Sequence, residues 1–217
     1  MDKKDRQYVI ESSLKALITF IPGIGGAIGS ILSDALADRK EERLNIFLQD
    51  LKSEIDNNRE AVNKTFVSKT DFLDVFDATA NKIANERSAE KRNAYKNILL
   101  NGILSPSYTY DDLENQMRTL SVLNEDHILL LKFFNSPQAF SEKSKSLKTG
   151  TFLQFFKQIL PHWENDYLKD ILNDLEVNRL INNISNNLQT MIMNVSADHF
   201  TDTLTSKGKT FVSFILR

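Results

Sequence analysis

An uncharged, glycine-rich stretch near the N-terminus constrains the fold of this chain more than any other segment. Residues 16–33 read ALITFIPGIGGAIGSILS, eighteen positions without a charge, and hold four of the seven glycines. Because proline clashes with the preceding helical turn, we expect Pro22 to end a first helix, and Gly23 to allow a tight reversal. The sequence therefore predicts a proline-broken helical corner, in which Gly25 and Gly29 let a neighbouring helix approach closely.

Two functional interpretations compete with this buried corner. A dinucleotide fingerprint needs its third glycine one position earlier than Gly29, and a phosphate-binding loop needs a lysine after its last glycine, so nucleotide binding is disfavoured. Membrane insertion is a stronger alternative, since a spanning helix needs about 20 apolar residues, but apolar runs of marginal length are more often buried core. The candidate residues for helix packing or membrane contact are Pro22, Gly23, Gly25, Gly26 and Gly29.

Composition favours a mainly α fold. Seven glycines and four prolines in 217 residues are few, which fits helices better than a turn-rich β-sandwich. The absence of cysteine excludes disulfides, thiolate metal sites and a cysteine nucleophile. It also fits a reducing compartment, and the charged N-terminus has no signal-like cleavage motif, so we expect a cytoplasmic protein. A net charge of −2 gives no overall attraction to nucleic acid or anionic lipid.

Apolar periodicity predicts an N-terminal helical bundle over residues 1–120. Within it the expected helices cover 6–20, 24–58, 71–86, 88–101 and 113–120. Ser68 or Thr70 is the expected cap of the third helix and Ser88 the cap of the fourth, because their oxygens accept free N–H groups of a first turn. Gly102 stands where a C-terminal glycine belongs.

The chain changes character near Leu123, and residues 121–217 form a second expected domain. Asn124 is the expected cap of a short apolar helix, followed by a polar loop over 135–150, a helix over 151–160 and another over 164–181. The segment 181–196 is expected to form two short strands around Ser185-Asn186-Asn187, and a helix capped by Thr205 or Ser206 closes the chain.

Two motifs give this second domain a resemblance to winged-helix proteins. They are Leu172-x-x-Leu175-x-x-x-Arg179-Leu180-Ile181 and Leu204-Thr205-x-x-Gly208-x-x-Phe211, and Arg179 stands where the family usually has glycine. The resemblance implies a small α+β domain with a wing, serving either nucleic-acid binding or protein interaction.

Three further motifs carry a second resemblance. They are Ile21-Pro22-Gly23-x-Gly25-Gly26, Arg43-Leu44-x-x-Phe47-Leu48-x-x-Leu51 and Ser88-x-Glu90-Lys91-Arg92-x-x-Tyr95-x-x-Ile98-Leu99. They resemble uncharacterised bacterial helical proteins often associated with mobile elements or abortive infection. This resemblance implies a bacterial origin and a role in stress or phage defence, but no activity.

No recognisable catalytic constellation is present in the sequence. His127, His162 and His199 lack metal-ligand spacing, and no serine lies in a nucleophile elbow. We therefore expect no catalytic, cofactor-binding or metal residues, no cofactor and no enzymatic activity. Basic residues cluster on two expected helices, but acids interleave them, which favours solvated faces: Arg39, Lys40 and Arg43 on one, and Arg87, Lys91, Arg92 and Lys96 on the other.

Three hypotheses of function follow. The first is a non-enzymatic cytoplasmic protein that binds a protein partner or itself. The second is a membrane-active effector using residues 16–33. The third is a winged-helix nucleic-acid regulator; its candidate contacts are Lys143, Lys145 and Lys148, because the expected third helix is rich in acids and phosphate contact requires bases.

Overall fold

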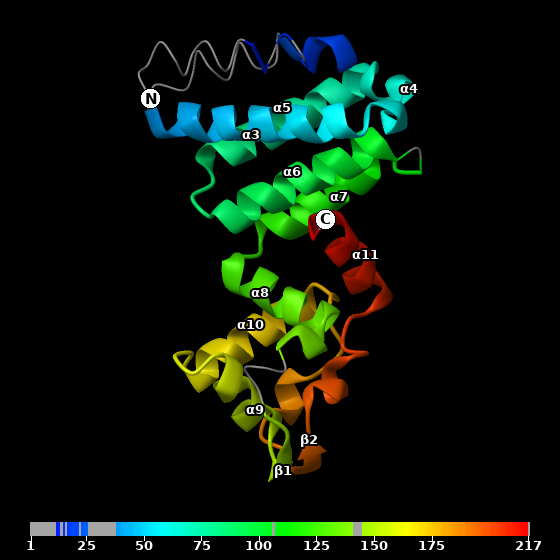
Figure 1. Ribbon diagram of the computed structural model, residues 1–217. Coiled ribbons are helices and arrows are strands. Elements are labelled where there is room, and N and C mark those ends of the chain that lie inside the picture. The colour runs from blue at the N-terminus through cyan, green and yellow to red at the C-terminus, as the bar shows by residue number, and fades with distance from the viewer. Residues whose placement is uncertain are drawn as a thin grey trace. The chain divides into compact units, whose positions relative to one another are not determined.

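The computed structural model describes residues 12–13, 15, 17–21, 23–25, 38–105, 107–140 and 145–216. The described chain is mainly helical with a small two-stranded antiparallel sheet, which confirms the expected mainly α class (Figure 1). It divides into two compact units, Met1–Val122 with Arg217, and Leu123–Leu216. In the part of the chain that is described, no helix has the length and apolar character needed to cross a membrane.

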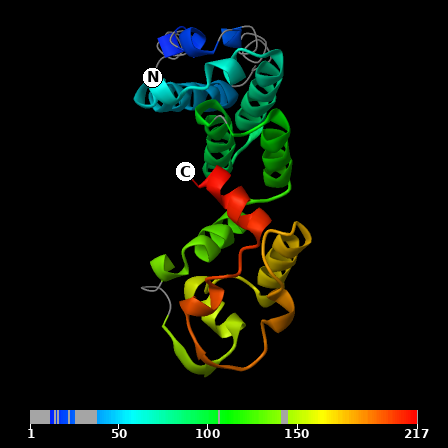
Figure 2. The same ribbon diagram turned by 90° about the vertical axis from the view of Figure 1, so that its right-hand side faces the viewer.

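The first unit is built from antiparallel helices whose apolar faces meet. Neighbouring pairs are α3 with α5, α5 with α6, and α6 with α7, and Figures 1 and 2 show these helices side by side. Their bounds, with the short turns between them, are α3 Asp38–Asn57, η1 Arg59–Ala61, α4 Lys64–Val67, α5 Thr70–Asn85, α6 Ala89–Leu104 and α7 Tyr110–Ser121.

Aromatic side chains fill much of the core of the first unit. The ring centroids of Phe47 on α3 and Phe76 on α5 are 5.9 Å apart, and those of Phe72 and Phe76 are 6.4 Å apart. Phe66 on α4 stacks on Tyr110 at 4.6 Å, and the Tyr110 hydroxyl donates to the Phe66 carbonyl. Each helix therefore contributes an apolar face at helical spacing, as the sequence predicts.

Two predicted helix ends in the first unit differ from the structure. The N-cap of α5 is Lys69, without a side-chain cap, because the Ser68 hydroxyl instead donates back to the Thr65 carbonyl. Gly102 does not end α6, which continues to Leu104. A Cβ at Gly102 would lie 2.5 Å from Leu113 Cδ1, so this glycine makes room for α7. Ser88 caps α6 as predicted, accepting from Lys91 N–H.

The glycine-rich corner is described only in part. Pro22, Gly26 and Gly29 lie outside the described residues. Gly23 has a φ of 87°, a left-handed conformation that glycine adopts freely, and a Cβ there would lie 2.7 Å from Leu73 Cδ1 of α5. At Gly25 the nearest side chain is Ile18, 3.3 Å from an added Cβ. The close approach to another helix of the bundle is therefore found at Gly23.

The second unit surrounds a phenylalanine core. Phe133 on α8 and Phe156 on α9 lie with ring centroids 5.5 Å apart, and Phe200 lies within 5.3 Å of both. The elements, shown in Figure 1, are α8 Glu125–Asn135, η2 Pro137–Phe140, β1 Leu147–Gly150, α9 Phe152–Ile159, α10 Asn165–Val177, η3 Ser185–Asn187, β2 Ile192–Val195, η4 Ala197–Phe200 and α11 Ser206–Ile215.

The sheet of the second unit does not have the predicted pairing. β1 lies in the segment that the sequence analysis assigned to a polar loop, and it pairs antiparallel with β2, with Leu147 opposite Val195 and Thr149 opposite Met193. Residues 185–187 form the 3-10 helix η3 and not the turn of a hairpin. The asparagines at 186 and 187 suggested a turn between two neighbouring strands. The partner of β2 is instead β1, more than forty residues earlier in the chain, and a pairing at that distance leaves no local sequence pattern.

The two motifs of the winged-helix resemblance meet at one junction. Arg179 N–H donates to Glu176 O and Leu180 N–H to Leu175 O, a Schellman motif that ends α10. Thr205 N–H donates to Leu180 O, and Ile181 forms an isolated antiparallel bridge with Leu204.

Gly208 is required by the same crossing. A Cβ on Gly208 would overlap the carbonyl oxygen of Leu180, so a residue without a side chain is needed where α11 crosses the end of α10. The motif residues thus fix a local crossing, while a wing of the kind expected at 181–196 is not observed.

Candidate functional site

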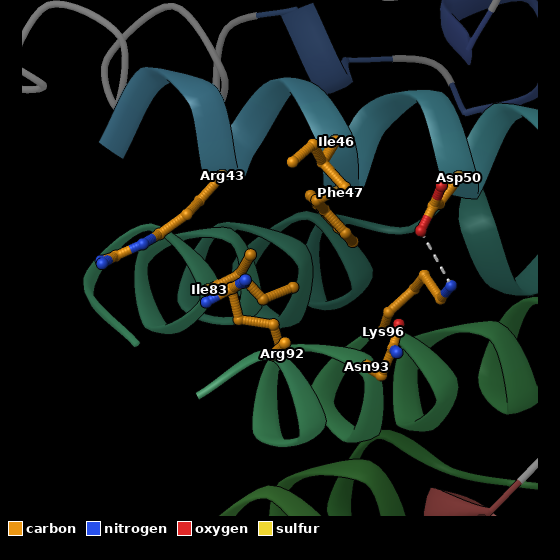
Figure 3. Close-up of a pocket in the computed structure, with 9 residues that line it drawn as sticks. Arg43, Ile46, Phe47, Asp50, Ile83, Arg92, Asn93 and Lys96 are labelled. Carbon is orange, nitrogen blue, oxygen red and sulfur yellow. Dashed lines mark hydrogen bonds and ion pairs between the residues drawn. The ribbon is translucent and has the colours of Figure 1, made fainter. Parts of the chain in front are cut away.

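A cationic pocket on the first unit is the strongest candidate site. Three helices line it, and its volume is about 170 Å³. Figure 3 shows Arg43, Phe47 and Asp50 leaving α3 on the side that faces α6, where Arg92 and Lys96 lie. We use the name cationic pocket for this set: Arg43, Ile46, Phe47, Asp50, Ile83, Ala89, Arg92, Asn93 and Lys96.

Two arginines are held in fixed orientations by the end of α5 and the connection that follows it. Arg43 Nη1 donates to the Ala84 carbonyl at 3.0 Å. Arg92 Nη1 donates to the carbonyls of Glu86 at 3.1 Å and Arg87 at 2.7 Å. The last carbonyls of a helix have no partner within it and carry partial negative charge, so a cation is favoured at Ala84, whereas Glu86 and Arg87 follow α5 and offer carbonyls of the α5–α6 connection. Both guanidinium groups therefore gather at one short connection, 84–87, although they come from different helices.

Each guanidinium retains donors for a ligand. A guanidinium carries five N–H donors in a rigid fork. Among the guanidinium nitrogens of these two arginines, only Nη1 of Arg43 and Nη1 of Arg92 make hydrogen bonds to described residues. The bonds to the segment 84–87 thus orient both forks and leave their other nitrogens able to donate to an anion. Orienting them beforehand lowers the conformational cost of binding.

The other charges of the site are arranged in ion pairs. Lys96 Nζ lies 3.1 Å from Asp50 Oδ2, the contact drawn as a dashed line in Figure 3. Lys91 Nζ lies 3.3 Å from Glu86 Oε2, beside the pocket. Burial raises the pKa of Glu86, but the hydrogen bond from Ser88 N–H and the Lys91 ammonium outweigh it and hold the pKa below its ordinary value. Glu86 therefore stays ionised and neutralises Lys91, and the positive charge is left at Arg43 and Arg92.

An apolar surface adjoins the cations. Phe47 and Ile83 are buried and form the floor, whereas Ile46 is 49% exposed at the rim. A ligand with negative charge alone would leave this apolar surface in water. The pocket therefore suits a group that carries an anion beside an apolar part.

The described residues contain no group of three or more histidine, aspartate or glutamate side chains placed to hold a metal ion. His127 is buried in the second unit, where Nδ1 accepts from Asn124 N–H and Nε2 lies 3.3 Å from Asp174 Oδ2. His199 Nδ1 accepts from Ser196 N–H at the start of η4. Both histidines thus take part in helix capping, and His162 is exposed on the loop before α10.

The lysines proposed for nucleic-acid contact are not brought into a formed site. Lys143 lies outside the described residues. Lys145 and Lys148 are exposed, and the backbone of Lys145 exchanges two hydrogen bonds with the Gln158 side chain, which anchors the segment entering β1 to α9. These contacts position the main chain and leave both ammonium groups in solvent.

A second hollow, of about 260 Å³, lies in the second unit between α10 and η3. Its lining mixes amides with one acid and one base, Asp166 and Lys169, and most of it is exposed. Glu176 accepts from Ser185 N–H at 2.7 Å and from the Ser185 hydroxyl at 2.7 Å, which ties η3 to α10. Within the described residues, neither Asp166 nor Lys169 makes a hydrogen bond or ion pair that would fix its side chain, so this hollow is the weaker candidate.

Comparison with protein-family models, with curated proteins and with solved structures gave no match.

Sequence reasoning identified the cations of the pocket but interpreted them as solvated faces. It could not see that Arg43 and Arg92 converge on the end of α5, because they are 49 positions apart in the chain and on different helices. The local signal was the spacing of Arg92 and Lys96, four residues apart and hence on one face of α6. The floor residues Phe47 and Ile83 were read only as core.

Proposed function

We propose that this protein is a non-enzymatic interaction protein, and that its cationic pocket binds an acidic, partly apolar segment of a protein partner. The observation that supports the proposal is the pair of guanidinium groups oriented by the carbonyls of the segment 84–87, beside the apolar floor of Phe47 and Ile83. Carboxylates accept from such forks in pairs, and the hydrogen bonds are charge-assisted. We place this role in the cytoplasm, as the cysteine-free composition suggests.

A protein segment fits this pocket better than a nucleic acid does. Binding to a phosphate backbone draws on many separate cations along one face. Here the cations of α6 are largely committed within the unit, since Lys91 pairs with Glu86 and Lys96 with Asp50. The two remaining cations sit over buried apolar carbon, an environment that matches a carboxylate side chain next to an apolar one.

The proposal is tested with a labelled peptide of alternating glutamate and leucine and a control peptide with glutamine in place of glutamate. Fluorescence anisotropy with the full chain is expected to show binding of the glutamate peptide only. The affinity should fall at least tenfold between about 50 mM and 500 mM salt, because the Debye length shortens as salt increases and the attraction between exposed charges weakens.

The double variant Ile46→Asp/Asn93→Asp disables the pocket and leaves Arg43 and Arg92 in place. Both side chains are exposed, so the fold is expected to persist, while two negative charges repel the peptide. Equal binding of the glutamate and glutamine peptides, or unchanged binding by the double variant, would contradict the proposal. Tight binding of inorganic phosphate without binding of peptide would instead identify a small-anion site.

A further inference from the structure

The second unit presents a row of three aspartates, two of which have no hydrogen-bond or ion-pair partner among the described residues. Asp166, Asp170 and Asp174 follow each other at four-residue steps on α10, and all three are exposed. Asp174 contacts His127, but within the described residues the carboxylates of Asp166 and Asp170 make no hydrogen bond or ion pair. We use the name acidic face for these three residues.

The acidic face is an unfavourable arrangement for an isolated helix. Like charges four residues apart repel each other along a helix surface. Lys169 lies three residues after Asp166 and offsets part of the repulsion at that end of the row, but no basic residue of α10 lies three or four positions from Asp170 or Asp174. A binding partner with positive charge would relieve this repulsion.

Exposed apolar side chains accompany the acids on α10. Tyr167 is 38% exposed and its hydroxyl donates to Asp126, while Val177 at the end of the helix is 80% exposed. The helix thus carries carboxylates and apolar groups together, which is the chemistry that the cationic pocket selects.

We propose that the segment bound by the cationic pocket is the acidic face of α10 from a second copy of this chain. Charge complementarity supports this occupant. Asp166 and Asp170, one turn apart on α10, present carboxylates that make no hydrogen bond or ion pair within the described residues, and Arg43 and Arg92 present guanidinium groups that retain donors. The two carboxylates can therefore accept charge-assisted hydrogen bonds from the two guanidinium groups of the pocket.

The contact is heterologous, since the pocket lies on one unit and the acidic face on the other. Each copy then offers one pocket and one helix, and association continues from copy to copy unless the geometry closes a ring. This inference rests on the proposed function but goes further, because it names the bound segment.

Sedimentation velocity on the full chain tests the proposal. At protein concentrations from about 5 to 200 µM in low salt, the wild type is expected to form dimers and larger species, as weak interfaces do over this range. The double variant Asp166→Lys/Asp170→Lys should raise the apparent dissociation constant at least tenfold. A matched control, Asp74→Lys/Glu114→Lys, changes the net charge equally at exposed positions of the first unit outside the pocket, and should associate like the wild type.

A mixing experiment separates this interface from any other. The Ile46→Asp/Asn93→Asp variant has a disabled pocket and an intact helix, and the Asp166→Lys/Asp170→Lys variant has the reverse. Each is expected to be monomeric alone, and their equimolar mixture should form a heterodimer that grows no further, because only one productive contact remains.

Any one of three results would overturn the inference. The wild type could stay monomeric at about 200 µM in low salt, either variant could self-associate as strongly as the wild type, or the mixture could stay monomeric. Retention of glutamate-peptide binding in that case would leave the proposed function standing, and loss of both would remove the two together. Circular dichroism of every variant verifies that the fold is retained.

Discussion

Single residues in this chain show where backbone geometry determines the amino acid. Arg179 has a φ of 58° at the end of α10, in the left-handed region that disfavours residues with a Cβ. Asn194 on β2 also has a positive φ, 56°, but asparagine tolerates this conformation. The sequence motif indicated glycine at position 179, and the structure explains why: the Schellman motif requires this conformation at that position.

Replacing Arg179 by glycine is therefore expected to stabilise the protein. The exposed side chain makes no hydrogen bond or ion pair to another described residue, and its removal relieves about 1 kcal/mol of conformational strain. The free energy of unfolding, measured in urea, should rise by that amount. Arg179→Ala is the matched control, since it removes the same side chain but retains a Cβ, and it should change little. A decrease for Arg179→Gly would contradict the strain argument.

At the level of elements, helices were predictable and their partners were not. Helical periodicity located α5, α6 and α10 because each has an apolar face at three- and four-residue steps. β1 was missed because four residues, LKTG, give too short a pattern, and its pairing with β2 is distant in sequence. The cationic pocket was missed for the same reason, since three helices must pack before Arg43 and Arg92 meet.

The α5–α6 connection gives an expected pH dependence. The pKa of Glu86 is lowered in the folded protein from its ordinary value of 4.5, so the unfolded state binds protons more readily. A carboxyl group of this kind contributes stability that is present above pH 4.5 and is lost as pH falls through the lowered folded pKa.

Glu86→Gln tests this assignment, because glutamine accepts hydrogen bonds but does not titrate. Its unfolding free energy should decrease less than that of the wild type as pH falls below 4.5, and the two curves should converge at the acid end. Thermal unfolding monitored by circular dichroism at several pH values measures both curves. Parallel curves throughout the acid range would show that Glu86 does not contribute.

At the scale of the whole molecule, each compact unit has its own apolar core. In the first unit the core includes Phe47, Phe72 and Phe76, and in the second it includes Phe133, Phe156 and Phe200. A separate core is what defines a domain physically. The mainly α class followed from composition and periodicity, whereas the composition of each core depended on contacts that only the folded chain shows.

Phe200 is expected to be the most sensitive of these core positions in the second unit. Its ring is fully buried and has aromatic neighbours on α8 and α9, at 5.3 Å from Phe133 and 5.0 Å from Phe156. Phe200→Ala should destabilise this unit by about 3–5 kcal/mol, because a cavity remains where the ring was. Met193→Ala, at a side chain that is 74% exposed in the same unit, should change stability by less than about 0.5 kcal/mol.

Hydrogen exchange measured by mass spectrometry on the full chain locates the effect of Phe200→Ala. Amides in α8, α9 and α11 should exchange faster in this variant, because opening of the second unit exposes helices that surround the cavity. Those of the Met193→Ala variant should match the wild type. Unchanged protection of α8 and α9 in Phe200→Ala would mean that the phenylalanine cluster does not hold the second unit together, and its stability would then have to come from the α10–α11 crossing at Leu180 and Gly208.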